Sequence, residues 1–139
     1  MERSSGATPP RQPGADSLGR DVDLLSVEVD RTGDRITIVA LRGELDLSTI
    51  PRLEGSLFGE IEAGRNVVVD LTPLSFIDSS GIGLLIKAHL GAEKNAALLH
   101  VVVAPGSQVD RVFDLTGIGN AIPLFPDRDQ AIEALPLPA

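Results

Sequence analysis

The chain has 139 residues, a formal net charge of −8 and no cysteine. This length suits one domain with a sizeable buried core, and the lack of cysteine excludes disulfides, thiolate metal ligands and a thiol redox switch. The negative charge and an aromatic content of 3% argue against nucleic-acid binding, which uses basic patches and stacking rings. Two histidines without a metal-ligand spacing give no reason to expect a metal, and we expect no cofactor.

Residues 1–21 are rich in Pro, Gly, Ser and Arg and carry almost no large apolar side chain. Such a segment cannot bury enough surface to offset its ordering entropy. We therefore predict a disordered N-terminal tail over 1–21 and one folded domain over 22–136. No apolar run approaches the ~20 residues needed to cross a bilayer, and the N-terminus has no signal-peptide core. We expect a cytoplasmic protein that does not associate with membranes.

The folded part begins with two strand patterns joined by a turn. Leu25, Val27 and Val29 alternate with polar residues, which is typical of a half-buried strand. After a turn over 30–34, both faces of Arg35–Arg42 are largely apolar, which indicates an interior strand. The two strands are predicted to form an antiparallel hairpin.

Two helices and a strand are expected in the middle of the chain. The first helix has Ser48 or Thr49 as a plausible N-cap and runs to about Ala63. The apolar run Val67–Val69 predicts a buried strand. The second helix is expected over about 80–94, again from the spacing of its apolar residues.

The last part of the chain continues the alternation of strands and helices. Phe113 and Leu115 are predicted to be core residues. The expected elements are a strand over Ala97–Val103, a helix opened by Ser107, a short strand over Ile122–Phe125 and a terminal helix over Asp127–Leu135. This order indicates an α/β fold with right-handed crossovers. The opening hairpin makes the central sheet mixed, with about five strands.

The stretch from Val67 to Lys87, VVVDLTPLSFIDSSGIGLLIK, joins the buried strand to the second helix. Pro73 interrupts the strand, and Phe76-Ile77 is expected to return to the core. Asp78-Ser79-Ser80-Gly81 then supplies residues that start helices. Because free N–H groups and a partial positive charge lie at a helix start, the site is well suited to hold a phosphate.

The residues by themselves leave several roles open at this helix start. Ser79 is a phosphate acceptor or a helix cap, and Ser80 is a competing acceptor or a capping hydroxyl. Asp78 is expected to contribute to capping and to partner recognition. Gly81 and Gly83 would let another backbone approach the helix closely. A glycine-rich nucleotide loop is a weak rival, because no third glycine and no Lys-Ser/Thr follow at the needed spacing.

The order D-S-S-G-I-G after V-V-V-D-L resembles the phosphorylation motif of STAS domains, specifically that of bacterial anti-sigma factor antagonists. The likeness extends over roughly Leu24 to Leu135, from Gly43-Glu44-Leu45-Asp46 to the segment RVFDLTG at 111–117. In that family the first serine of the pair is the phosphoacceptor, which falls on Ser79. The family also packs its helices mainly against one face of the sheet.

The resemblance implies a non-enzymatic phosphoswitch in transcription regulation, with no catalytic residue. The unphosphorylated domain would bind an anti-sigma factor of the ATP-dependent serine-kinase type and thereby release a sigma factor for a stress response. Phosphorylation of Ser79 would reverse the association, and a serine phosphatase would reset it. The implied docking residues are Asp46, Thr49, Asp78, Ser80, Gly81, Ile82 and Gly83. Whether the chain is a monomer or a weak homodimer stays open.

Two other functions stay open at this point. One is a STAS scaffold or accessory subunit of a signalling or membrane lipid-transport complex. The other is a small hydrolase that uses Ser79. The G-x-S-x-G elbow of such hydrolases is missing, and neither His89 nor His100 has a nucleophile at a readable spacing. Both histidines are expected to be structural or exposed.

Overall fold

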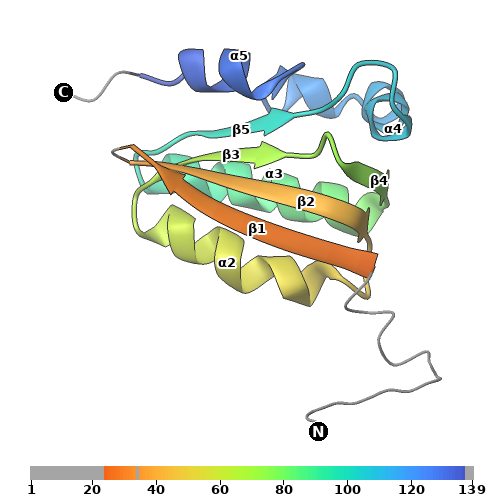
Figure 1. Ribbon diagram of the computed structural model, residues 1–139, viewed down its shortest axis with the longest axis horizontal. Coiled ribbons are helices and arrows are strands. Elements are labelled where there is room, and N and C mark those ends of the chain that lie inside the picture. Colours follow the sequence, from red (N-terminus) through yellow and green to blue (C-terminus); the bar gives the residue numbers. More distant parts are fainter. Residues whose placement is uncertain (1–23, 34, 137–139) are drawn as a thin grey trace, which may run out of the picture.

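The computed structural model describes residues 24–33 and 35–136. The tail predicted over 1–21 therefore lies outside the described residues. Helices and strands alternate along the chain as Figure 1 shows. They are β1 (Leu25–Thr32), β2 (Ile36–Leu45), α2 (Ile50–Glu62), β3 (Asn66–Asp70), β4 (Leu74–Ile77), α3 (Ser79–Lys94), β5 (Leu99–Val102), α4 (Gln108–Thr116), a 3-10 turn (Ile118–Asn120), β6 (Leu124–Phe125) and α5 (Arg128–Glu133).

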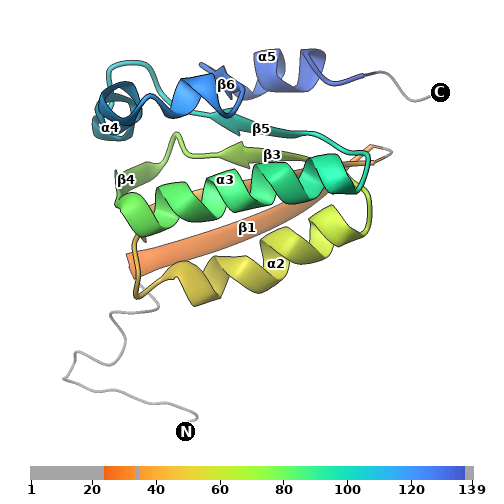
Figure 2. The same ribbon diagram turned by 180° about the vertical axis from the view of Figure 1, so that it is seen from behind.

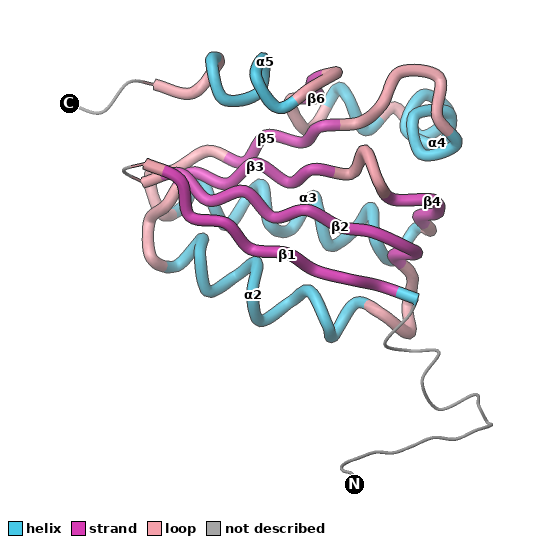
Figure 3. The backbone as a smooth tube through the Cα atoms, in the orientation of Figure 1, coloured by secondary structure: helices cyan, strands magenta, loops and turns pink. Residues whose placement is uncertain are grey.

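The strands form one mixed six-stranded sheet of order β1-β2-β3-β5-β6, and β4 pairs with β2 outside that row (Figure 3). The antiparallel β1–β2 hairpin is confirmed, and every other pairing is parallel. The predicted α/β class and the interior position of the second strand are confirmed as well. The sheet has one strand more than the sequence pattern indicated.

The additional strand, β4, exists because β2 is long enough to pair twice. The first half of β2 pairs with β3, and after a register shift at Gly43/Glu44 its second half pairs with β4. Ile77 is 2% exposed, whereas Phe76 is 39% exposed, so the prediction that both return to the core is wrong for Phe76. Side chains alternate along a strand, and with Ile77 inward Phe76 must point to the other face.

Helices lie mainly on one face of the sheet, as predicted. Figure 2 shows α2 and α3 side by side over that face, and α4 adds Val109 and Phe113 to the same core. The sheet side of this core consists of Leu25, Val39, Leu41, Val67, Val69, Leu99 and Val101. Helix α5 packs on the opposite face, above β3 and β5, in a smaller apolar cluster.

Two polar contacts attach α5 to its face of the sheet. Arg128 Nε lies 2.6 Å from Asp70 Oδ2, and the Asp70 side chain is 5% exposed. His100 Nδ1 lies 2.9 Å from the carbonyl oxygen of Ala131. Neither contact was found from sequence, because each joins residues more than thirty positions apart. They orient a helix too short to hold its place by its own hydrogen bonds.

The prediction that Leu115 is a core residue is wrong. Its side chain is 87% exposed, whereas Phe113 on the same helix is 2% exposed. Successive residues of a helix are separated by about 100° around the axis, so a side chain two positions after an inward one points away from it. The inward row of α4 consists of Val109 and Phe113.

A buried carboxylate joins α2 to the hairpin beside its turn. The Glu60 side chain is 8% exposed and accepts hydrogen bonds from Arg31 Nε and Nη2, at 2.9 and 2.6 Å, and from Thr37 Oγ1 at 2.7 Å. Arg65 Nε donates to the same Thr37 hydroxyl at 2.7 Å. The Arg31 hydrogen bonds, with help from Thr37, lower the pKa of Glu60 from 4.5 to about 2. Sequence analysis missed this network.

Glu60→Gln is expected to lower the free energy of unfolding at neutral pH by roughly 2 kcal/mol, because it removes the charge of a buried carboxylate that accepts hydrogen bonds from Arg31 and Thr37. The folded-state pKa of Glu60 lies below its unfolded value, so its contribution is present above pH 4.5 and is lost as the pH falls through about 2. Urea unfolding between pH 7 and pH 2 measures this. The variant should converge with the wild type at low pH, and an equal gap at every pH would contradict the account.

Candidate functional site

Helix α3 begins at a well-formed cap. The backbone of Asp78 is extended, and its Oδ1 accepts hydrogen bonds from the backbone N–H of Ser80 at 2.9 Å and of Gly81 at 3.1 Å. The carboxylate therefore fills the capping role that the sequence left open for the two serines. The helix starts at Ser79, one residue earlier than predicted.

The Ser79 side chain is free for another role. Ser79 is exposed and occupies the first position of α3. Among the described residues, no hydrogen bond to its hydroxyl is present, whereas Ser80 is half-buried. An exposed hydroxyl next to free backbone N–H groups can accept a phosphoryl group without disturbing the cap.

The two glycines after the serines differ in their surroundings. Gly81 is buried, and a Cβ there would lie 2.8 Å from Ile77 Cγ1 and 3.0 Å from Leu45 Cγ, so close packing within the domain explains this glycine. Gly83 is exposed, and a Cβ there would meet nothing within 4 Å. Of the two, Gly83 alone offers a bare backbone to a molecule outside the chain.

The turn between β2 and α2 is organised by Asp46. Its Oδ1 accepts hydrogen bonds from Ser48 Oγ at 2.7 Å, from Ser48 N at 3.0 Å and from Thr49 N at 3.1 Å. The Ser48 hydroxyl is the main cause that lowers the pKa of Asp46. Thr49 is fully buried, and its Oγ1 donates to Glu44 O at 2.8 Å and accepts from Asp46 N at 2.9 Å. Thr49 thus shapes the turn from inside rather than presenting its hydroxyl at the surface.

The fold brings this turn next to the start of α3. β2 and β4 pair in parallel up to Leu45 and Ile77, and the Asp78 N–H donates to Leu45 O at 3.2 Å. Asp46 follows Leu45, and Ser79 follows Asp78. The two residues therefore leave the sheet at the same end, where β4 and the start of α3 meet in Figure 1.

Apolar side chains are exposed close to this edge. Leu47, in the Asp46 turn, is 74% exposed, and Phe76 of β4 is 39% exposed. Ile82 is half-buried against the core. We call the group Asp46, Leu47, Ser79 and Gly83 the switch surface. Sequence analysis did not select Leu47, because a single apolar residue in a polar turn is not by itself a signal of a contact.

The two histidines do not assemble a hydrolase site with Ser79. His100 is 5% exposed and lies on the opposite face of the sheet, against Ala131 and Phe125. His89 is ten residues further along α3 than Ser79, which is about 15 Å along the helix axis. A general base must lie within hydrogen-bonding reach of its serine. Within 24–33 and 35–136, no group of three acidic or histidine side chains could hold a metal ion.

The fold and the site together define a class of protein: a small α/β domain with a mixed sheet, helices mainly on one face, and an exposed serine at the start of a central helix beside the β2–α2 turn. No helix in the described ranges is long and apolar enough to span a membrane. The model of the STAS domain family matches residues 27–131, and the chain belongs to that family.

Similar proteins carry names from sigma-factor regulation. The Anti-sigma-B factor antagonist of Staphylococcus aureus is 32% identical over 88 residues, which are 63% of this chain and 81% of that protein. The crystal structure of an anti-sigma factor antagonist from Mycobacterium paratuberculosis superposes with a TM-score of 0.72 at 27% identity, covering 81% of this chain and 95% of that one. The unphosphorylated anti-sigma factor antagonist SpoIIAA shares the fold, with a TM-score of 0.61 at 21% identity over 78% of this chain and 96% of that one.

Proposed function

We propose that this protein is an anti-sigma factor antagonist whose docking to a kinase-type anti-sigma factor is controlled by phosphorylation of Ser79. The observation that carries the proposal is the exposed Ser79 hydroxyl at the capped start of α3, beside the Asp46 turn. The name of the Staphylococcus aureus relative supports the same function.

The chemistry of the helix start explains how the switch would work. A phosphoryl group adds a charge of about −1.5 to −2 at neutral pH. The N-terminal end of a helix favours negative charge, so the folded domain tolerates the addition. A docked partner experiences the opposite effect, because it must desolvate a dianion that lies close to the carboxylates of Asp46 and Asp78. The modification therefore acts on the complex and leaves the fold unchanged.

The same contact serves docking and phosphoryl transfer. A kinase that modifies Ser79 must bring its ATP to the start of α3, and Gly83, one turn further on, allows its surface to approach the helix backbone. Leu47 offers an apolar contact at the rim of this area. In the proposed cycle the unphosphorylated protein binds the anti-sigma factor and a sigma factor is released. Phosphorylation ends the association, and a serine phosphatase restores it.

Incubation with a candidate anti-sigma kinase and ATP, followed by mass spectrometry of the digested protein, tests the assignment. We expect one phosphate, on Ser79. Ser79→Ala should accept none, and the matched variant Ser80→Ala should still be modified, since Ser80 is half-buried and its amide is held by the Asp78 cap. Phosphate on Ser80 in the wild type would overturn the assignment of Ser79 as the phosphoacceptor. A kinase that binds the protein and transfers no phosphate would overturn the switch.

A further inference from the structure

Helix α2 has two glycines in its interior that no contact among the described residues explains. Gly55 and Gly59 are exposed, and a Cβ at either position would meet nothing within 4 Å. Glycine inside a helix is less favourable than alanine by roughly 0.5–1 kcal/mol. Glycines four positions apart lie on the same side of a helix and expose a strip of bare backbone. Figure 2 shows α2 at the rim of the helical layer, with no other described helix or strand over it.

Two opposite charges flank this strip. Arg52 lies one turn before Gly55, and Glu62 lies one turn after Gly59. Both side chains are exposed and neither has an ion pair with another described residue. Arg52 Nε makes one hydrogen bond, to Leu25 O at 3.3 Å. The four positions are symmetrical about Leu57, with the two charges about 15 Å apart along the axis.

An open groove of about 470 Å³ runs beside the strip, between β1 and α2. Val29 of β1 lines it and is 43% exposed, whereas Leu25, earlier in the same row of the strand, is fully buried. Gly55, Ser56 and Gly59 form the helical wall. The Arg31–Glu60 ion pair closes one end. The groove is therefore level with Leu57, the centre of symmetry of α2. Val29, the exposed apolar residue of the groove, lies at this level.

We propose that this face of α2 binds a second copy of the chain, with the two α2 helices antiparallel across a two-fold axis at Leu57. In this register Gly55 lies against Gly59 of the second copy, and Arg52 lies opposite Glu62 of the second copy, twice by symmetry. The bare glycine backbones allow the helices to approach closely. The two-fold axis places Val29 of each copy at the same height along the axis, where the two side chains leave water together. The charge pattern excludes the parallel arrangement, since it would place like charges opposite each other.

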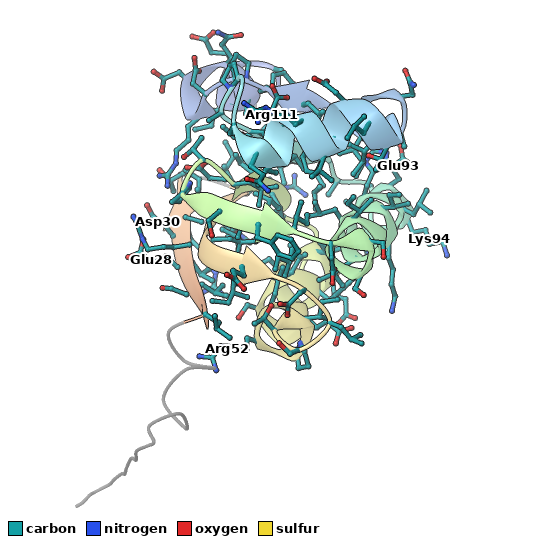
Figure 4. The ribbon with its side chains drawn as sticks, turned by 90° about the vertical axis from the view of Figure 1, so that its right-hand side faces the viewer. Glu28, Asp30, Arg52, Glu93, Lys94 and Arg111 are labelled. Carbon is teal, nitrogen blue, oxygen red and sulfur yellow. The ribbon has the colours of Figure 1, made fainter. Side chains whose placement is uncertain are left out.

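The edge of the sheet formed by β1 is a poor alternative surface for self-association. Edge strand β1 could extend the sheet symmetrically by pairing with a second β1. In a two-fold antiparallel pair, the row that contains Glu28 and Asp30 would face the same acidic row of the other copy. Figure 4 shows these two carboxylates side by side at the sheet surface. Like charges opposite each other destabilise strand pairs, so this edge is protected from self-pairing.

Sedimentation velocity of the full chain over a range of protein concentrations, combined with charge reversal, tests the proposal. The wild type is expected to shift from monomer to dimer as its concentration rises. Arg52→Glu and Glu62→Arg should each weaken the dimer by roughly tenfold or more, because each places two like-charged pairs in the interface. An equimolar mixture of the two variants should dimerise again, because every pair is then of opposite charge. Arg111→Glu, on α4 and far from Arg52 in Figure 4, is the control with the same change in charge.

A second pair of measurements separates assembly from folding. Gly59→Gln should raise the free energy of unfolding of the dilute monomer, because it removes a helical glycine from open space, and should weaken the dimer. Wild-type protein that stays monomeric at every concentration overturns the proposal. So does a dimer that Arg52→Glu leaves unchanged, or a mixture of the charge-reversed variants that stays monomeric. The proposed dimer face of α2 contains no residue of the switch surface. Phosphorylation of Ser79 can therefore be established or refuted independently of dimerisation.

Discussion

Ser79→Asp is expected to weaken binding to the kinase-type anti-sigma factor by roughly 10²-fold, and full phosphorylation by roughly 10²–10⁴-fold. Desolvating an unpaired charge at an interface commonly costs several kcal/mol, and about 1.4 kcal/mol corresponds to a tenfold change in Kd. The exposed Ser79 side chain makes no hydrogen bond with another described residue, so the aspartate should leave the fold intact. Isothermal titration with purified kinase measures the change directly.

The control for this experiment is Ser79→Ala, which is expected to bind as tightly as the unphosphorylated wild type and to stay bound when ATP is added. Thermal unfolding of both variants should match the wild type within about 0.5 kcal/mol, the range of exposed substitutions. If Ser79→Asp binds the kinase as tightly as the wild type, the electrostatic account of the switch fails. A matching loss of affinity in Ser79→Ala would instead show that the hydroxyl itself is the contact.

Gly43→Ala is expected to lower the free energy of unfolding by more than about 3 kcal/mol. Gly43 has φ of +109°, a conformation that side chains rarely adopt, and a Cβ there would overlap the carbonyl group of Leu24. Both strain and overlap would have to be relieved by moving β1 away from β2, at the start of their pairing. Chemical denaturation with circular dichroism measures the loss.

Gly106→Ala is the matched control, because Gly106 also has a positive φ, of +77°, but a Cβ there would meet nothing within 4 Å. It should cost only about 1 kcal/mol, the price of the backbone conformation alone. Equal losses in the two variants would contradict the role of the Leu24 overlap. Gly43 also marks the register shift at which β2 turns from β3 to β4. Its replacement is therefore expected to disturb the approach of the Asp46 turn to Ser79.

The start of α3 is the part of the site that could be predicted residue by residue. Asp78, Ser79 and Ser80 precede a row of apolar residues at helical spacing, and helix initiation depends on backbone N–H groups within four residues of each other. The choice among the three capping side chains was open in the sequence. It was decided by geometry, because the carboxylate of Asp78 reaches the two free N–H groups and leaves the Ser79 hydroxyl outside.

The sequence by itself determined the alternation of strands and helices, the hairpin and the position of Ser79 at a helix start, because these depend on contacts between near neighbours in the chain. The tertiary structure alone decided the pairing of β4 with β2, the exposure of Phe76 and Leu115, the burial of Thr49, the Glu60 network and the symmetrical face of α2. Each of these depends on which surfaces meet across the sheet. Hydrophobic burial is not directional, so the apolar pattern of the chain shows which faces are buried but not which faces meet.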